Sequence, residues 1–133
     1  MSCSEICEAN HILREHWKAG PENRAKGEEW LNKIYKQNLS TATDNFVAHK
    51  DFDFISREIT YGFYLSDHTI LDPLATELVT LAGIMIQNLP LQTAWHLRGT
   101  RRVGVSTEDV ELVQECVSNT MLQEFDDVRL TYC

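Results

Sequence analysis

The residues best suited to chemistry are one histidine and one glutamate in two consecutive apolar segments. His96 stands in TAWHLRG, residues 93–99, between a tryptophan and a leucine. Glu77 is the only charged residue between Pro73 and Ile86. A lone buried carboxylate is costly, so it needs a partner or a proton. A carboxylate that orients an imidazole makes a proton-transfer pair, because it sets the tautomer and leaves the second ring nitrogen for a substrate.

The same two residues also have a purely structural interpretation. A buried Glu77–His96 hydrogen bond could simply tie two helices together, as buried polar pairs commonly do. Only the short break at 88–90 separates the two segments, so we expect them to pack antiparallel and to place both side chains on facing surfaces. This placement is compatible with either role.

Helix-length segments separated by proline, glycine and small polar residues predict an all-α domain, because no run alternates apolar and polar residues. The best-defined helix follows Asp72, a good N-cap, and has Pro73 in its first turn. Its apolar composition predicts burial on most sides. The next helix is expected to end at Gly104, after the basic Arg101 and Arg102.

The rest of the chain completes one domain of about six helices over 1–133, with an N-terminal extension at 1–20. The final helix begins at a capping box formed by Ser106 and Asp109. The remaining expectations are a helix over 5–19, a second from Pro21 that carries Trp30 to Tyr35, a connection at 38–45, a third helix from near Phe46 or Phe52 to Leu65, and a loop at 66–72.

Composition indicates one globular domain and excludes several partners. The chain has 133 residues, of which 43% are hydrophobic and 24% charged. A chain of this length buries only a small core, so we expect a homo-oligomer, in which subunit contacts bury additional surface. The net charge of -8 argues against nucleic acid and anionic membranes as partners. The longest apolar run, 81–86, is too short to span a bilayer, and the acidic start lacks a secretory pattern, so we expect a cytoplasmic protein.

The four cysteines predict neither a disulfide framework nor a metal site. Cys3, Cys7, Cys116 and Cys133 are few and scattered, which fits a reducing compartment. Cys3 and Cys7 have helical spacing, but no second pair of ligands accompanies them. We therefore assign no metal.

The stretches ITYGFYLSD, LDPLATELVTLAGIM and LQTAWHLRGTRRVGVSTEDVELV resemble the carboxymuconolactone decarboxylase family, which shares the fold of the alkylhydroperoxidase D proteins. The resemblance covers 52–117 and extends more weakly back to Trp17. Its most specific part is a histidine followed by Leu-Arg, a glycine turn and an acid-capped helix. It implies an oligomer (dimer, trimer or hexamer) with His96 in the active site. Glu77, nineteen residues earlier, matches the glutamate of the proton relay in the peroxidase branch.

Departures from the family narrow the expected activity. The peroxidase branch carries Cys-x-x-Cys where this chain has Leu89 and Gln92, and without a dithiol we expect no peroxidase. The decarboxylases carry a glutamate where this chain has Phe63, and arginines where it has Leu-Ala-Thr at 74–76. The usual dicarboxylate lactone is therefore in doubt as the substrate.

The resemblance also suggests side chains that line the pocket. Arg98 matches the family's own arginine, and Asp67 and His68 lie in a loop near its pocket rim. Aromatic residues stand at polar family positions, namely Tyr61, Phe63 and Tyr64, which indicates a more apolar pocket for an aromatic or polyketide-like substrate. The candidate substrate-binding residues are Arg98, Trp95, Phe63, Tyr64, His68 and Asp67, although solvated or core roles remain open for them.

Three hypotheses for function follow. In the first, the protein is a cofactor-free decarboxylase or isomerase of a small oxygenated acid, lactone or polyketide-like intermediate. His96 is its general acid or base, Glu77 orients His96, and the substrate delocalises its own carbanion into an adjacent carbonyl. In the second, the pocket templates a cyclisation or rearrangement of a natural-product intermediate in secondary metabolism. In the third, the chain is a non-catalytic oligomeric binding protein.

Overall fold

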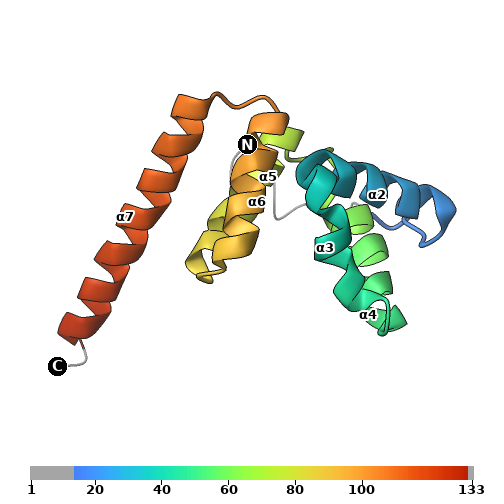
Figure 1. The fold of residues 1–133 in the computed structure, drawn as a ribbon, viewed down its shortest axis with the longest axis horizontal. Helices are drawn as coiled ribbons and strands as arrows, with labels where there is room; N and C mark the ends of the chain where they lie inside the picture. Colours follow the sequence, from blue (N-terminus) through green and yellow to red (C-terminus); the bar gives the residue numbers. More distant parts are fainter. Residues whose placement is uncertain (1–13, 132–133) are drawn as a thin grey trace.

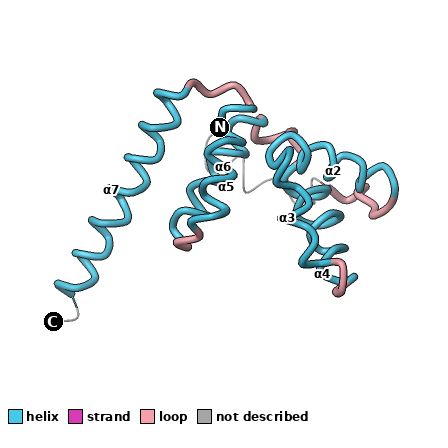
Figure 2. Tube along the Cα trace, viewed as in Figure 1, coloured by secondary structure: helices cyan, strands magenta, loops and turns pink. Residues whose placement is uncertain are grey.

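The computed structural model describes residues 14–131, with side chains described as far as residue 120, and every regular element in that range is a helix (Figure 2). The all-α prediction is confirmed, since this range contains no strand. The elements in chain order are α2 (Pro21–Tyr35), the 3₁₀ turn η1 (Lys36–Asn38), α3 (Leu39–Thr43), the 3₁₀ turn η2 (Asp44–Phe46), α4 (Lys50–Phe54), the π-helix η3 (Ile55–Leu65), α5 (Pro73–Ile86), α6 (Pro90–Arg102) and α7 (Thr107–Thr131).

The helices form two groups joined by α2, and α7 extends away from both (Figure 1). Helix α2 packs on η3 on one side and on α6 on the other. Helices α5 and α6 form an antiparallel hairpin. Helix α7 packs mainly on this hairpin and contacts both of its helices. Among the described helices, none combines the length and apolarity needed to cross a membrane.

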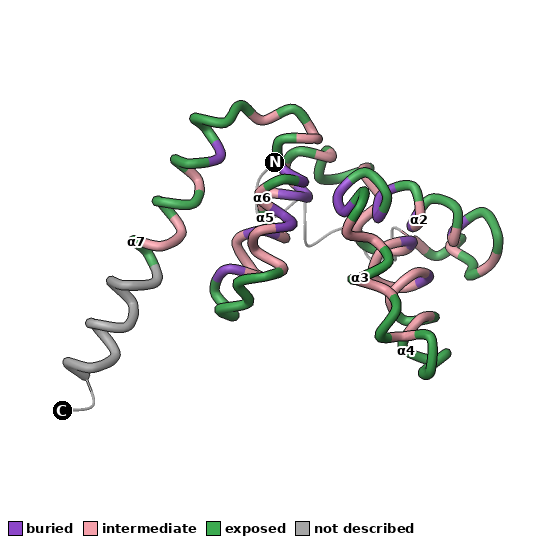
Figure 3. The backbone as a smooth tube through the Cα atoms, viewed as in Figure 1, coloured by how far each residue is buried: buried purple, intermediate pink, exposed green. Residues whose placement is uncertain are grey.

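The hydrophobic core lies where α2 meets α6. Trp30, Leu31, Ile34 and Tyr35 of α2 pack with Trp95 of α6, and each is at most 6% exposed. Figure 3 shows that the buried backbone positions concentrate on α2, α5 and α6. Burial of these large side chains is the main stabilising contribution that the described part of the chain displays.

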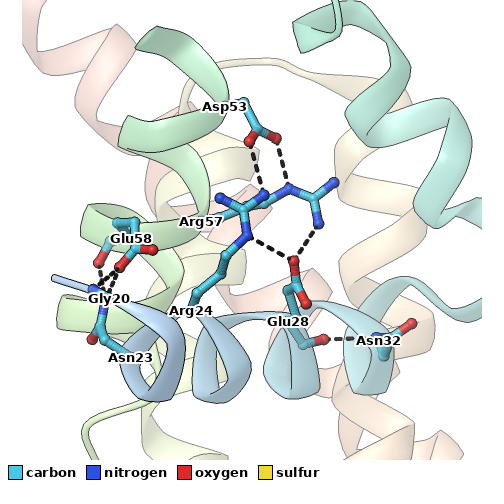
Figure 4. A network of polar contacts seen from close by, with 8 residues as sticks. All are labelled: Gly20, Asn23, Arg24, Glu28, Asn32, Asp53, Arg57 and Glu58. Carbon is cyan, nitrogen blue, oxygen red and sulfur yellow. Dashed lines mark hydrogen bonds and ion pairs between the residues drawn. The ribbon is translucent and has the colours of Figure 1, made fainter. Parts of the chain in front are cut away.

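Two glycines allow α2 and η3 to approach closely. A Cβ atom on Gly27 would lie 2.5 Å from the carbonyl oxygen of Arg57, and one on Gly62 would lie 2.4 Å from Nδ2 of Asn23. The same Nδ2 donates to the carbonyl and to Oε2 of Glu58, both at 2.8 Å (Figure 4). The contact between α2 and η3 therefore has no room for a side chain at the two glycines. It also gives the buried side-chain amide of Asn23 its hydrogen-bond acceptors.

A four-residue ionic network covers the outside of this contact (Figure 4). Asp53 accepts from Arg57 at 2.6 Å and from Arg24 at 2.9 Å, and Glu28 accepts from the same two arginines at 2.9 and 3.1 Å. Partial burial alone would raise the pKa of Asp53, but the hydrogen bonds from the two arginines hold it below its ordinary value. The network connects α2 with α4 and η3.

Several predicted boundaries are wrong. Residues 14–19 form a turn and irregular chain rather than the end of a helix, and the rest of the helix expected over 5–19 lies outside the described residues. The expected connection at 38–45 is helical, because Leu39 and Ala42 pack against the core and override the turn preference of the polar residues around them. The third helix is confirmed, with its start close to Phe52: it begins at Lys50 and runs to Leu65, partly as a π-helix.

The predictions for the last three helices are mostly confirmed. Asp72 caps α5 by accepting from the amide of Ala75 at 2.7 Å. Ser106 accepts from the amide of Asp109 at 3.0 Å, so the predicted N-cap is present at α7, but the carboxylate of Asp109 accepts from the Ser106 hydroxyl at 2.8 Å in place of the reciprocal bond of a capping box. The expected end at Gly104 overshoots α6 by two residues.

The prediction that α5 is buried on most sides is wrong. Val79 and Ile86 are each 62% exposed, whereas Leu81 is fully buried. Helix α5 packs mainly against α6 and the beginning of α7, so its outer face is left uncovered by the described part of the chain.

Candidate functional site

Glu77 of α5 and His96 of α6 are in direct contact. Nδ1 of His96 lies 2.8 Å from Oε1 of Glu77, and the two side chains are 1% and 0% exposed. The antiparallel α5–α6 hairpin brings the two residues face to face, as the short break between them predicted. The pair therefore exists inside the protein and is shielded from water.

The backbone of α6 approaches this pair at a glycine. A Cβ atom on Gly99 would lie 2.9 Å from Oε1 of Glu77 and 2.7 Å from Cγ2 of Ile34. Thr100, the next residue, donates its hydroxyl to the carbonyl oxygen of His96 at 2.8 Å. Because residue 99 is a glycine, the carboxylate of Glu77 has the space that a side chain at this position would fill.

The second ring nitrogen of His96 contacts a tyrosine. The hydroxyl oxygen of Tyr35 lies 2.9 Å from Nε2 of His96, and it also lies 2.9 Å from the hydroxyl oxygen of Tyr61. Glu77, His96, Tyr35 and Tyr61 therefore form one continuous hydrogen-bonded chain, to which α5, α6, α2 and η3 each contribute one residue. We call these four residues the relay.

Burial shifts the pKa values along the relay. Burial raises the pKa of Glu77 above its ordinary 4.5, and the hydrogen bond with His96 offsets part of that rise. The second oxygen of Glu77, Oε2, is buried without a hydrogen-bond partner among the described residues. Burial also raises the pKa of Tyr35 and, more strongly, that of Tyr61, so both tyrosines remain protonated at neutral pH.

The protonation state of Glu77 sets the direction of the relay. An ionised carboxylate only accepts, so Nδ1 of His96 then donates to it and Nε2 accepts from Tyr35. The oxygen of Tyr35 in turn accepts from the hydroxyl of Tyr61. When Glu77 carries a proton, donor and acceptor exchange roles in all three hydrogen bonds. The same atoms can therefore carry a proton toward His96 or away from it.

The relay ends at an open cavity of about 290 Å³. Tyr35 and Tyr61 line this cavity with Trp95, whereas His96 is not among its lining residues. The volume is at the lower end of the range for small-molecule pockets, about 300–1,000 Å³. The other lining residues are neutral: Leu31, Thr41, Ala42, Thr43, Asn45, Phe46, Ser56, Leu91 and Gln92.

Four of the sequence-predicted substrate residues gather elsewhere. The guanidinium of Arg14 pairs with Asp67 at 2.6 Å and lies 5.0 Å and 5.8 Å from the ring centres of Phe63 and Tyr64. His68 packs its ring edge on a core tryptophan at 4.8 Å. None of these residues lines the cavity at Tyr35.

The two predicted substrate-binding residues on α6 also lie at different sites. Trp95 is 6% exposed, belongs to the core and lines the cavity. Arg98 is exposed and lines a different surface groove with Arg101 and Arg102. Trp95 is thus the one predicted substrate-binding residue that the structure places at the end of the relay.

Sequence reasoning missed the role of Tyr35. The sequence places Tyr35 on the same face of the second helix as Trp30, Leu31 and Ile34, and Tyr61 was interpreted as an aromatic residue at a polar family position. The available signal was the type of residue: a tyrosine on a core face has a hydroxyl that needs a partner when it is buried.

The described residues contain no group of three or more His, Cys, Asp or Glu side chains placed to hold a metal ion. Cys116 is exposed and free. Cys3, Cys7 and Cys133 lie outside the described residues.

No family model, no curated protein and no solved structure matches the chain. Any membership of the carboxymuconolactone decarboxylase family is therefore a proposal that rests on the stretches quoted above.

Proposed function

We propose that the protein is a proton-transfer enzyme in which His96 exchanges a proton with a small-molecule substrate through Tyr35 and Tyr61. The observation that supports this proposal is the unbroken relay from buried Glu77 to the two tyrosines that line the cavity. A buried Tyr35 hydroxyl needs a partner in any case, but its continuation to Tyr61 and the cavity gives the imidazole a path to a ligand.

In the basic direction, the relay removes a proton from the substrate. The substrate proton passes to the oxygen of Tyr61, the Tyr61 proton passes to Tyr35, and the Tyr35 proton passes to Nε2 of His96. The imidazolium that results is stabilised by the Glu77 carboxylate. In the acidic direction, the three transfers reverse and Tyr61 delivers a proton to the substrate.

The reaction class that fits is a cofactor-free isomerisation or decarboxylation. Both need only a substrate that holds its own carbanion as an enolate beside a carbonyl. We also propose that the chain is a divergent member of the carboxymuconolactone decarboxylase-like group and works as a homo-oligomer. Its small described core and the exposed outer face of α5 support self-association.

A templating enzyme is the second candidate, and the lining of the cavity favours it. Aromatic Trp95 and Phe46 share that lining with neutral polar groups, which could hold a flexible intermediate in a reactive shape. Such an enzyme would tolerate His96→Ala and lose activity when Trp95 is truncated. The third candidate, a binding protein, would show affinity without turnover.

Exchange of hydrogen for deuterium tests the proton-transfer proposal without knowledge of the natural substrate. Cyclohexanone and γ-butyrolactone are incubated with the protein in D₂O, and loss of the α-proton signal is followed by NMR. We expect the wild-type protein to accelerate exchange of at least one probe, and His96→Ala to reduce this rate by about 10²–10⁴-fold.

His49→Ala, which removes an exposed imidazole before α4, is the matched control and should exchange at the wild-type rate. The proposal is overturned if the wild-type protein accelerates neither probe, or if folded His96→Ala retains the full rate.

A further inference from the structure

We infer that the cavity at Tyr35 and Tyr61 binds an uncharged ligand with a carbonyl or hydroxyl group and rejects carboxylates. This inference names the substrate class of the proposed function and rests on it for the reacting group. It concerns binding, however, and can be measured separately from turnover.

The first support is the absence of a counter-ion in the lining. The described residues that line the cavity include no Lys, Arg or His, and their polar side chains other than the tyrosines are Thr41, Thr43, Asn45, Ser56 and Gln92. A carboxylate that leaves water for such a site loses its hydration without gaining an ion pair, which strongly opposes binding.

The nearest arginine along the chain is already engaged. Arg57 follows Ser56, but its Nε donates to Asp53 at 2.6 Å and its Nη1 donates to Glu28 at 2.9 Å (Figure 4). Arg102, on α6, donates to the backbone carbonyl of Ile34. Neither guanidinium therefore faces the cavity as a free cation.

The overall charge of the chain also disfavours an anionic ligand. Glu77 stands behind His96, and the chain as a whole carries a net charge of -8. A carboxylate ligand would approach a negative protein and would raise the cost of ionising Glu77 further. A neutral ligand meets neither penalty.

The two tyrosine hydroxyls in the lining of the cavity suit a carbonyl or hydroxyl. The hydroxyls of Tyr35 and Tyr61 are 2.9 Å apart. With Glu77 ionised, the Tyr61 hydroxyl donates to Tyr35 and its oxygen accepts from a ligand hydroxyl; with a proton on Glu77, the Tyr61 hydroxyl is free to donate to a ligand carbonyl. The ring of Trp95 stands 5.7 Å from that of Tyr35, at an interplanar angle of 72°, and gives the cavity an aromatic wall. A flat ligand with one polar oxygen beside the two hydroxyls satisfies both features.

The consequence for chemistry is a preference between the two proposed reactions. Decarboxylation requires a carboxylate, because the bond that breaks leaves its electron pair on carbon and releases CO₂. Isomerisation of a ketone, enone or lactone moves a proton and needs no charged group. The cavity therefore favours isomerisation of a neutral carbonyl compound.

Matched ligand pairs test the inference directly. The pairs are methyl 4-oxocyclohexanecarboxylate with its free acid and methyl 4-hydroxybenzoate with its free acid, titrated by calorimetry at neutral pH. We expect the ester of at least one pair to bind about tenfold or more tightly than its acid, a difference of about 1.4 kcal/mol. Equal affinities, tighter binding of the acids, or no binding by any of the four would overturn the inference.

A variant that adds a positive charge to the lining provides a second measurement. Gln92→Arg places a cation in the lining and should strengthen binding of the free acid by about tenfold, because it supplies the missing partner. Gln87→Arg adds the same charge at an exposed position that does not line the cavity, so it is the matched control. An acid affinity that rises equally in both variants, or in neither, contradicts the inference.

The two proposals fail separately. Preferential ester binding without deuterium exchange would leave the ligand class standing and overturn the proposed reaction. Deuterium exchange together with preferential binding of the acids would overturn the ligand class and leave the reaction standing.

Discussion

The hydroxyl oxygen of Tyr35 lies 2.9 Å from Nε2 of His96, between the imidazole and the cavity. Because His96 is 1% exposed, it meets a ligand in this arrangement only through the tyrosine. The group that would touch a substrate is thus Tyr35 or Tyr61, and His96 is the proton reservoir behind them.

Glu77 and His96 should behave as one functional unit. His96→Ala removes the proton acceptor and should lower turnover by about 10²–10⁴-fold. Glu77→Gln leaves the imidazole without a carboxylate to stabilise its charged form, so turnover should also fall. The double variant should lose much less than the product of the two effects, because residues that act together are not additive.

The measurement is deuterium exchange for each variant, with thermal melting as a fold control and Glu115→Gln, on the exposed face of α7, as the charge-matched control. Multiplicative losses in folded proteins would mean that the two residues act independently.

Removal of the two tyrosine hydroxyls should have unequal effects. Tyr35→Phe breaks the relay at the hydrogen bond between Tyr35 and Nε2 of His96, and should reduce exchange by about 10²-fold or more. Tyr61→Phe leaves Tyr35 in the cavity and in contact with His96, so the loss should be smaller. Exchange rates measured across the pH range for both variants check this order, and an equal loss would show that the proton does not pass through Tyr35 alone.

The sequence predicted the features that depend on neighbouring residues. Asp72 and Ser106 cap helices through side chains that reach amides three residues away, so the residue types alone were sufficient. The Glu77–His96 contact was also within reach, because a very short break leaves the two helices few arrangements other than antiparallel packing.

Features that depend on distant packing could not be predicted. Tyr35 and His96 are 61 residues apart, and their contact exists only because α2 crosses α6. Spacing also could not tell on which side of η3 each aromatic residue lies. Tyr61 reaches the cavity, whereas Phe63, two residues later, packs with Trp17 at 4.7 Å. The rotation of a helix about its axis decides this, and tertiary packing sets that rotation.

Alanine at two helix glycines should have opposite effects on stability. Gly83, on α5, has no atom within 4 Å of an added Cβ, so Gly83→Ala should stabilise the protein by roughly 0.5–1 kcal/mol through lower unfolded-chain entropy. Gly99→Ala pushes its methyl group against Ile34 and Glu77 and should destabilise by about 1–3 kcal/mol. Urea denaturation of both variants measures the difference. A stabilising Gly99→Ala would show that the carboxylate of Glu77 does not occupy the space beside α6.

The ionic network between α2 and η3 should contribute a small, salt-sensitive stability. Asp53→Asn removes the carboxylate that accepts from both Arg24 and Arg57, and should lower the free energy of unfolding by about 1 kcal/mol at low salt. Asp51→Asn, at an exposed position of the same helix, is the matched control and should change it by less than about 0.5 kcal/mol. The gap between the two variants should narrow in about 1 M salt, where the charges are screened. A gap that salt leaves unchanged would assign the effect to packing.

The raised pKa of Glu77 should make wild-type stability fall with pH relative to Glu77→Gln. The folded protein keeps a proton on this carboxyl at pH values where the unfolded chain has lost it. Between the ordinary value of 4.5 and the raised folded value, the folded state therefore binds more protons than the unfolded state, so the free energy of unfolding decreases as pH rises.

Chemical denaturation of both proteins from about pH 4 to about pH 8 measures this difference, since the titrating groups away from the Glu77–His96 contact largely cancel between them. We expect the stability of the wild-type protein minus that of Glu77→Gln to decline across the window and then level off once Glu77 is ionised in both states. A difference that instead rises with pH would mean that the contact with His96 outweighs burial and lowers the pKa of Glu77. In that case Glu77 would be ionised throughout the neutral range, and the relay would have the single direction in which His96 accepts from Tyr35.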